Sequence, residues 1–439
     1  LNVSVISTNS VSYGVYASSD YVTISSVNVD AGGNITQAGL RISSWTAVSY
    51  SSVTVFGAHG LRVDGILNNV SYTNAVTSGT AIYALFLNAA SSNSFTVFLA
   101  SNPAGHGAAL SGNSNFNTIV QSTMASDTAG GYAALYITGS SSNSVVGSRI
   151  INPKGYAANV GGTYNRVSYS TVRSDALSNG GAFIFNGSVG GVVNNSFIFN
   201  PVGSAVNMTN AARLNTIESS TVTSGSSSYF TFNMGGAGTS SNTISNSYVG
   251  NTAGHALLIS NNASHNTITQ STIVATGSFF SAYEVRTSSF NTVTASFMNS
   301  PNGYAVRIKT GGAFNSIGLS TMTSASSVYP AVWMENTSSH TISQCYVQGS
   351  TAVFVSHSTG TVIDSSLLVA TNTAANALYF SSGSVNLTLT RTGLRGGVSA
   401  SAVRLETGNS GALTLSSNTI LGGSYGLFIA TQTPGLFSL

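Results

Sequence analysis

The chain has 439 residues, of which 13 are Lys or Arg and 10 are Asp or Glu, so charged residues make up 5% of it, against about 25% in ordinary soluble domains. A net charge of +3 without basic clusters argues against nucleic-acid binding, which needs many phosphate contacts. A hydrophobic fraction of 42% excludes charge-driven disorder. No apolar run reaches the length of about 18 residues that a membrane-spanning helix needs, so no membrane insertion is expected.

An eight-residue pattern, Asn-Thr-Ile-x-x-Ser-x-Val, recurs along the chain at a spacing of about 24 residues. Positions in each copy are numbered from its central aliphatic residue, the register residue. The predicted register residues are, in chain order, Leu1, Val22, Val48, Val70, Phe95, Ile119, Val145, Val167, Val193, Ile217, Ile244, Ile268, Val293, Ile317, Ile342, Val362, Leu389 and Leu415. Position −2 is often Asn, position +3 is usually small and polar or Cys345, and position +5 is apolar from Ile6 to Ile420.

A second apolar stretch follows each copy, as at residues 84–87 and 305–308, and turn clusters such as 152–155 separate the stretches. The stretches alternate apolar and polar residues and favour β-branched side chains, which predicts short strands. The alternation of inward and outward residues changes phase between the register residue and position +3. This change predicts a bend between two short strands. One copy cannot bury its own apolar face, but stacked copies can. We therefore predict an all-β solenoid of about 18 parallel coils with Asn and Ser ladders inside.

The coil period and the column of Asn residues make the chain resemble the right-handed parallel β-helix superfamily, which includes pectate-lyase-like enzymes and phage tailspikes. The Asn residues that carry the resemblance are Asn93, Asn117, Asn143, Asn165, Asn215, Asn242, Asn266, Asn291 and Asn315. The resemblance implies one single-stranded, right-handed β-helix domain over residues 1–439. It does not specify a function, because this fold carries many activities. The missing caps, with Leu1 and Leu439 close to register positions, lead us to expect a segment of a longer or processed protein.

The densest group of charged residues falls on the second apolar stretches of successive copies. Two outward columns are predicted there, one with Glu284, Arg307, Trp333 and then Phe354, and one with Arg286, Lys309 and Glu335. One interpretation is a binding site for an acidic or neutral glycan, in which the cations bind carboxylates and the indole stacks on a sugar. The other is a surface ion ladder, in which each pair contributes only about 0–1 kcal/mol.

The first column belongs to a longer outward row on the second stretches. This row contains Phe86, Tyr136, Trp333, Phe354, Tyr379 and Phe428, with Arg41, Arg62, Arg307 and Arg404 at equivalent places. A row of exposed aromatic residues predicts a face that binds a glycan, a neighbouring chain or a covering segment. Asn159, Asn207 and Thr231 interrupt the row, so ordinary isolated exposure is the alternative.

Two tripeptides, 105–107 and 307–309, match short motifs of polygalacturonase-type glycosidases, which share this fold. They lie about eight coils apart, and the chain has no adjacent aspartates, whereas inverting glycosidases need two carboxyl groups about 6.5–9.5 Å apart. We interpret both matches as accidental and assign no catalytic residue. The scattered carboxylates and histidines predict no metal site and no cofactor. His106 and His255 take a corner position that Tyr fills in other coils, so we expect them to pack there.

Coil lengths stay near 24 residues without a long insertion, whereas an enzyme of this fold usually interrupts its repeat to build a site. The sequence therefore predicts a secreted or cell-surface rod with a structural or adhesive function. Its expected partners are other copies of itself or extracellular glycans. A polysaccharide lyase or glycosidase centred on the two charged columns stays open as the alternative.

Overall fold

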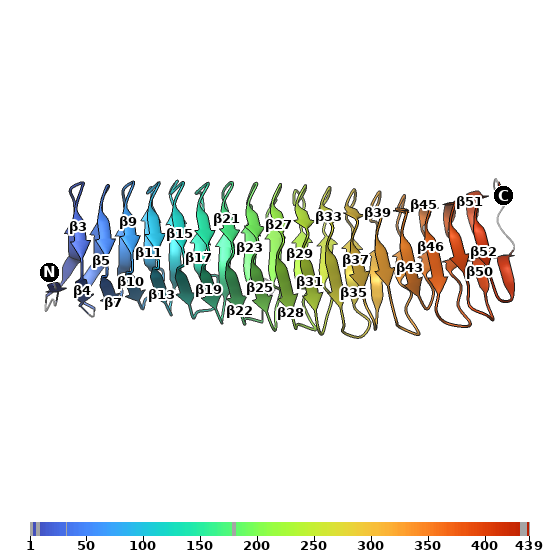
Figure 1. Ribbon diagram of the computed structural model, residues 1–439, viewed down its shortest axis with the longest axis horizontal. Coiled ribbons are helices and arrows are strands. Elements are labelled where there is room, and N and C mark those ends of the chain that lie inside the picture. Colours follow the sequence, from blue (N-terminus) through green and yellow to red (C-terminus); the bar gives the residue numbers. More distant parts are fainter. Residues whose placement is uncertain (1–2, 6–8, 32, 178–180, 431–436, 439) are drawn as a thin grey trace. The chain divides into compact units, whose positions relative to one another are not determined.

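The computed structural model describes residues 3–5, 9–31, 33–177, 181–430 and 437–438. These residues contain strands, turns and loops but no helix, so none of them provides a helix that could cross a membrane. They group into two compact units, Leu1–Thr221 and Val222–Leu439. In each unit the strands form three parallel sheets, named A, B and C, and equivalent strands follow one another turn by turn (Figure 1). The expected all-β parallel solenoid is confirmed.

The first unit contributes the following strands. Sheet A contains β1 (Val3–Val5), β4 (Val27–Asp30), β7 (Ser52–Val55), β10 (Asn74–Thr77), β13 (Leu99–Asn102), β16 (Thr123–Ser126), β19 (Arg149–Asn152), β22 (Thr171–Ser174) and β25 (Phe197–Asn200). Sheet B contains β2 (Val11–Ala17), β5 (Ile35–Ile42), β8 (His59–Val63), β11 (Tyr83–Asn88), β14 (His106–Ser111), β17 (Ala133–Ile137), β20 (Tyr156–Val160), β23 (Phe183–Asn186) and β26 (Val206–Thr209). Sheet C contains β3 (Thr23–Ser25), β6 (Ala47–Ser49), β9 (Asn69–Ser71), β12 (Ser94–Thr96), β15 (Thr118–Val120), β18 (Ser144–Val146), β21 (Arg166–Ser168), β24 (Val192–Asn194) and β27 (Thr216–Glu218).

The second unit repeats this arrangement. Sheet A contains β28 (Thr221–Ser224), which begins at the last residue of the first unit, β31 (Tyr248–Asn251), β34 (Thr272–Ala275), β37 (Phe297–Asn299), β40 (Thr321–Thr323), β43 (Tyr346–Gly349), β46 (Leu367–Ala370), β49 (Gly393–Arg395) and β52 (Thr419–Leu421). Sheet B contains β29 (Phe232–Gly235), β32 (Leu257–Ser260), β35 (Ser281–Arg286), β38 (Tyr304–Lys309), β41 (Val332–Glu335), β44 (Val353–Ser356), β47 (Leu378–Phe380), β50 (Ser401–Leu405) and β53 (Tyr425–Ile429). Sheet C contains β30 (Thr243–Ser245), β33 (Thr267–Thr269), β36 (Thr292–Thr294), β39 (Ser316–Gly318), β42 (Thr341–Ser343), β45 (Thr359–Asp364), β48 (Val385–Thr390), β51 (Ser410–Ser416) and β54 (Phe437–Ser438).

Sheet C carries the register residues on its inner face. Two of the predicted register residues are wrong: Val48 pairs with Ile24 and not with Val22, and Ile342 pairs with Ile363 and not with Val362. Val22 precedes the true register residue, Ile24, by two positions. Side chains alternate between the two faces of a strand, so the pattern predicts the same face for both residues. Val362 and Ile363 are adjacent aliphatic residues, and only the second is fully buried. The predictions for Leu1, Ile6 and Leu439 lie outside the described residues.

The predicted bend between sheets C and A is a single residue in the left-handed region at position +2. Its φ is +48° at Gln121 and +48° at Gln270. A non-glycine residue in this conformation costs about 1–3 kcal/mol, so neighbouring interactions must hold it. The serine at position +3 does so, because Ser122 Oγ accepts the Phe98 N–H at 3.0 Å and donates to the Val120 carbonyl at 2.7 Å. The predicted Ser ladder is therefore present.

The asparagines at position −2 form buried ladders within each unit. In the first unit, Nδ2 of each residue donates to Oδ1 of the next over 2.8–3.0 Å, along Asn68, Asn93, Asn117, Asn143 and Asn165. In the second unit the same contacts are 3.0 Å along Asn242, Asn266, Asn291 and Asn315. The next residue in that column is His340, whose Nδ1 accepts the backbone N–H of Asn315 at 3.2 Å. These ladders satisfy amides that lie away from water.

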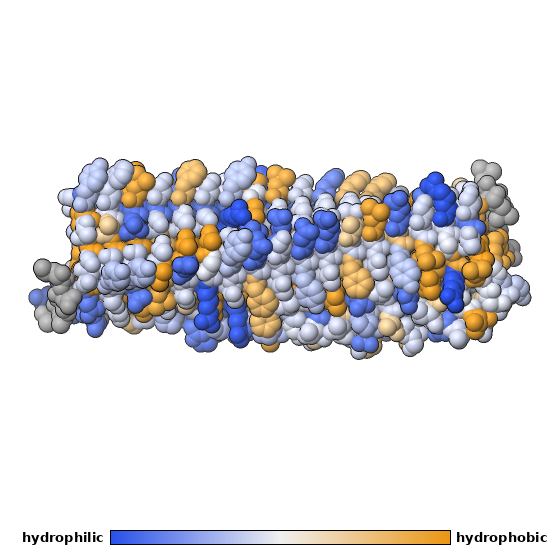
Figure 2. Space-filling view, in the orientation of Figure 1, coloured by the Kyte–Doolittle hydropathy of each residue, from blue (hydrophilic) through white to orange (hydrophobic). Residues whose placement is uncertain are grey.

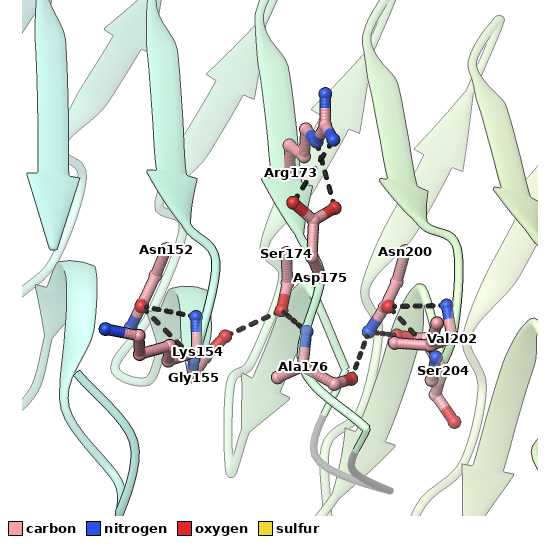
Figure 3. Close-up of polar contacts among 11 residues, drawn as sticks. Asn152, Lys154, Gly155, Arg173, Ser174, Asp175, Ala176, Asn200, Val202 and Ser204 are labelled. Atoms are coloured by element: carbon pink, nitrogen blue, oxygen red, sulfur yellow. Dashed lines mark hydrogen bonds and ion pairs between the residues drawn. The ribbon is translucent and has the colours of Figure 1, made fainter. Parts of the chain in front are cut away.

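A second internal polar column, which the sequence did not suggest, holds the turns between sheets A and B (Figure 3). Asn152 Oδ1 accepts the backbone N–H groups of Lys154 and Gly155 at 3.2 and 3.1 Å. In the next turn, Ser174 Oγ donates to the Gly155 carbonyl at 2.7 Å. Asn200 Nδ2 then donates to the Ala176 carbonyl at 3.1 Å. The Asn of each Asn-Pro-x-Gly cluster thus closes its own turn, and the column connects it to the turn before.

Candidate functional site

The predicted site residues meet on sheet B of the second unit. Strand pairing places Glu284, Arg307, Trp333, Phe354 and Tyr379 opposite one another on successive strands β35, β38, β41, β44 and β47. The neighbouring column consists of Arg286, Lys309 and Glu335. Parallel strands lie about 4.8 Å apart. Both columns therefore bring these side chains together, as expected from aligning the repeats within the chain.

Glu284 makes an ion pair with Lys309 of the adjacent coil, as the ladder interpretation expected, but its carboxylate is buried and does not lie at the surface. The residue has 0% exposure, and its Oε1 contacts Arg286 Nε at 2.6 Å and Lys309 Nζ at 3.2 Å. Its Oε2 accepts the Ser281 hydroxyl at 3.2 Å. Burial alone would raise the pKa of Glu284, but the hydrogen bond from Arg286 and the charges around the carboxylate outweigh it and lower that pKa. The carboxylate is therefore ionised and enclosed, and its contacts are those of a structural group.

His255 closes the side of this cluster. Its ring stacks on Phe230 at 4.5 Å between centroids, and its Nδ1 accepts the Ser281 N–H at 2.9 Å. Nδ1 also lies 3.2 Å from Glu284 Oε2. Burial is the main reason that the pKa of His255 falls to about 4, and the charges of nearby cations such as Arg286 lower it further against the opposing effect of Glu284. His255 is consequently neutral at pH 7.

The corner position of His255 has counterparts in the first unit. His59 Nδ1 accepts the Tyr83 N–H at 3.1 Å, and His106 Nδ1 accepts the Ala133 N–H at 3.0 Å. The predicted corner packing of His106 and His255 is confirmed, because each ring connects one turn to the backbone of the next. Over the described residues, no group of three or more His, Cys, Asp or Glu side chains could hold a metal ion.

A cleft of about 320 Å³ opens beside the charged cluster. It is lined by Tyr304, Val328, Tyr329, Pro330, Trp333, Thr351, Phe354 and Tyr379. The rings of Trp333 and Phe354 meet edge to face at 6.1 Å and 88°, and those of Phe354 and Tyr379 at 5.0 Å and 79°. Both ring faces and ring edges therefore line the cleft.

Arg307 lies against one wall of this cleft. Its guanidinium carbon is 4.5 Å from the centre of the Trp333 ring and 5.2 Å from that of Tyr304. Among the described residues, Arg307 has no carboxylate within ion-pair distance, and its Nε has no hydrogen-bond partner. Burial raises the pKa of Tyr304 to about 12, so its hydroxyl stays protonated at pH 7. The cleft thus combines a largely apolar lining with phenolic hydroxyls, and the Arg307 cation packs against two of the lining rings.

Trp333 and Phe354 were expected on the outward row, but Tyr304 and Tyr329 were not placed in the site. They lie in and after the turns that lead to sheet B, where the number of residues varies from coil to coil. The recurrence of Tyr or His at this corner is a sequence signal for these residues. It does not place them relative to the cleft, because the turns before sheet B differ in length from coil to coil.

The outward row is not uniformly exposed. In the first unit, Phe86 packs against His59 and Tyr83 at 4.8 and 4.6 Å, and Tyr136 packs against His106 at 4.7 Å. Corner side chains therefore cover much of the outer face of sheet B. On the face seen in Figure 2, strongly hydrophilic and hydrophobic residues both occur as scattered spots among weakly polar ones.

No family model matches this chain, and no curated protein matches its sequence. Solved structures similar to it include the A-module of the mannuronan C-5 epimerase AlgE6 of Azotobacter vinelandii, with 9% identity over 94% of this chain and 90% of that one and a TM-score of 0.35. Another is the catalytic domain of a GH87 alpha-1,3-glucanase in complex with tetrasaccharides, with 10% identity over 67% and 63% and a TM-score of 0.43. A third is the tailspike protein gp49 of Pseudomonas phage LKA1, with 12% identity over 79% and 50% and a TM-score of 0.38. At these values the likenesses carry no argument on activity, and the fold assignment rests on the strand pairing of the chain itself.

Proposed function

We propose that this chain is a non-catalytic, glycan-binding β-solenoid that acts outside the cell, and that the cleft around Trp333 holds sugar rings. The observation that carries the proposal is the lining of the cleft, in which five of the residues are aromatic. A pyranose has apolar C–H faces and a rim of hydroxyl groups. Aromatic side chains with a few well-placed polar groups match both parts of such a ligand.

The polar groups at the cleft support this ligand class. The Arg307 guanidinium packs against the rings of Tyr304 and Trp333 and makes no ion pair with a described residue, so its charge is available to oxygen atoms of a bound sugar. The Tyr379 hydroxyl donates to Glu406 Oε1 at 3.0 Å, which orients it at the cleft wall. A volume of about 320 Å³ is near the lower end for small-molecule sites and suits about one or two sugar rings of a longer chain.

Binding without catalysis is the role that the surroundings favour. The residues that line the cleft include no carboxylate, whereas glycoside hydrolysis needs two carboxyl groups flanking the bond. Glu284, which lies opposite Arg307 on the adjacent strand, is fully buried, and its carboxylate already contacts Arg286 and Lys309. An adhesive or structural role is consistent with stacked coils of the second unit that present such a cleft on sheet B.

Titration calorimetry with a panel of neutral and acidic oligosaccharides tests the proposal. The variant Trp333→Ala should lose at least about ten-fold in affinity, as expected for an aromatic anchor in a cleft. The matched control is Phe314→Ala, which removes an aromatic side chain that is 55% exposed and not part of the cleft lining. Tyr329→Ala provides a second cleft variant if Trp333→Ala fails to fold.

Two results would overturn the proposal. One is a failure of the binding test, seen either as a panel without any binding or as equal loss of affinity in the cleft variants and in Phe314→Ala. The other is the release of shorter or unsaturated products from a polysaccharide, which would favour the enzymatic alternative. Self-association and location at the cell surface stay predictions, and sedimentation velocity and fractionation of the source cells test them.

A further inference from the structure

A second cluster of charged and aromatic residues lies on sheet B of the first unit. Strand pairing places Tyr16, Arg41, Arg62 and Phe86 opposite one another on β2, β5, β8 and β11. Arg41 and Arg62 are therefore direct neighbours on adjacent strands, about 4.8 Å apart along the sheet. Like charges in such a pair repel each other, so the arrangement calls for compensating negative charge.

Asp64 supplies only part of that compensation. Its Oδ2 contacts Arg41 Nε at 2.6 Å, and its Oδ1 contacts Arg62 Nε at 2.9 Å. Two guanidinium groups that share one carboxylate carry a net charge of +1. The nearby His59 does not change this sum, because burial and the charge of Arg62 lower its pKa to about 4. The side chains of Arg41, Arg62 and Asp64 are only 24%, 23% and 19% exposed, so bulk water screens this charge less than it would screen a surface ion.

Aromatic rings fix both guanidinium groups in place. The Arg41 guanidinium carbon lies 5.2 and 4.8 Å from the ring centres of Tyr13 and Tyr16, and its Nη1 donates to the Tyr13 hydroxyl at 2.6 Å. The Arg62 guanidinium carbon lies 5.9 Å from the ring centre of Phe86. Nη2 of Arg41 and both Nη atoms of Arg62 make no hydrogen bond with a described residue. The pair thus presents rigid, unpaired donors beside an uncompensated positive charge.

We propose that Arg41 and Arg62 form a binding site for an oxyanion, either a carboxylate or a sulfate group carried by a ligand. The planar fork of a guanidinium matches the paired oxygen atoms of both groups. Stacked rings hold the forks before binding, which reduces the entropy lost when the ligand is bound. The site lies within residues 13–86 of the first unit and does not depend on the cleft of the second unit.

The test uses the full chain labelled with ¹⁵N-arginine. The chain has only 11 arginines, so the Nε–H signals can be assigned from single variants. Sodium sulfate and sodium acetate are titrated separately, with sodium chloride at matched ionic strength as the reference. We expect saturable shifts of the Arg41 and Arg62 signals, and at least about ten-fold weaker binding in Arg62→Gln, which loses a charged fork. Arg149→Gln, at an exposed arginine of the same unit, should bind the anions like the parent chain.

The variant Asp64→Asn should change the affinity for the anion in the opposite direction. It also tests the proposal if Arg62→Gln fails to fold. Asp64→Asn removes the carboxylate that competes with the ligand. Anion binding should become at least about five-fold tighter, because one unit charge at about 4 Å has this effect in bulk water and a larger one where water screens it less. Stronger shifts with sulfate would indicate a sulfated ligand, stronger shifts with acetate a carboxylated one, and either supports the proposal. Shifts no larger than those in chloride, equal shifts at Arg149, or weaker binding in Asp64→Asn would overturn it.

Discussion

Replacing Asn117 by alanine removes four hydrogen bonds from the ladder of the first unit. Its Oδ1 accepts from the backbone N–H and from Nδ2 of Asn93 at 3.0 and 2.9 Å, and its Nδ2 donates to the Ala90 carbonyl and to Asn143 Oδ1 at 2.9 and 3.0 Å. Asn93 Nδ2 keeps the Gly65 carbonyl, and Asn143 Oδ1 keeps the backbone N–H of residue 117. The backbone N–H of Asn93 loses its acceptor, and a buried N–H group without an acceptor costs about 1–3 kcal/mol. With a small cavity added, we expect a loss of about 2–4 kcal/mol in the free energy of unfolding.

The matched control for this variant is Asn159→Ala. Asn159 is also nearly buried in the first unit, but its Oδ1 has no hydrogen-bond partner. Its replacement removes an unsatisfied group and should cost less than about 0.5 kcal/mol or stabilise the chain. Urea unfolding followed by circular dichroism gives both values when the slope m is unchanged, and hydrogen exchange of the ladder amides reports local opening. An Asn117→Ala variant that loses no more stability than Asn159→Ala would refute the role assigned to the ladder.

Three further variants test other buried groups. Glu284→Gln leaves Arg286 and Lys309 without their shared carboxylate, but both cations stay partly exposed, so the free energy of unfolding should fall by about 1–3 kcal/mol; an unchanged urea midpoint would contradict this. Burial holds the pKa of His340 at about 4, below about 6.5 in an unfolded chain, so its contribution to stability is present above pH 6.5 and is lost as the pH falls through 4. His340→Asn should continue the ladder, stabilise the chain by about 1 kcal/mol at pH 7 and weaken this acid dependence, as urea midpoints at pH 7 and 4.5 will show. Burial raises the pKa of Cys345, so the native chain should react slowly with a thiol reagent, and Cys345→Ser should change stability by less than about 0.5 kcal/mol.

The candidate site was predicted in part. Strand register follows from spacing within the chain, so the alignment of Glu284 with Arg307 and Trp333 could be read before the structure was known. The burial of Glu284 could not, because it depends on His255 and on the other side chains that fold over sheet B. The aromatic cleft likewise needs Tyr304 and Tyr329, whose places depend on turn lengths that differ between coils.

The coil period, the inward columns of aliphatic, Asn and Ser residues, and therefore the parallel solenoid follow from the amino-acid pattern alone. These features are local, because alternation within a strand decides which side chains point inward, and a repeat of about 24 residues must stack to bury them. Which outward residues are covered, and therefore where a ligand could bind, depends on how the coils pack against one another. An outward side chain on sheet B is enclosed or exposed according to the turns of neighbouring coils, such as the corner that carries His255 beside Glu284. Those contacts join residues more than 20 positions apart, and no pattern within a single strand encodes them.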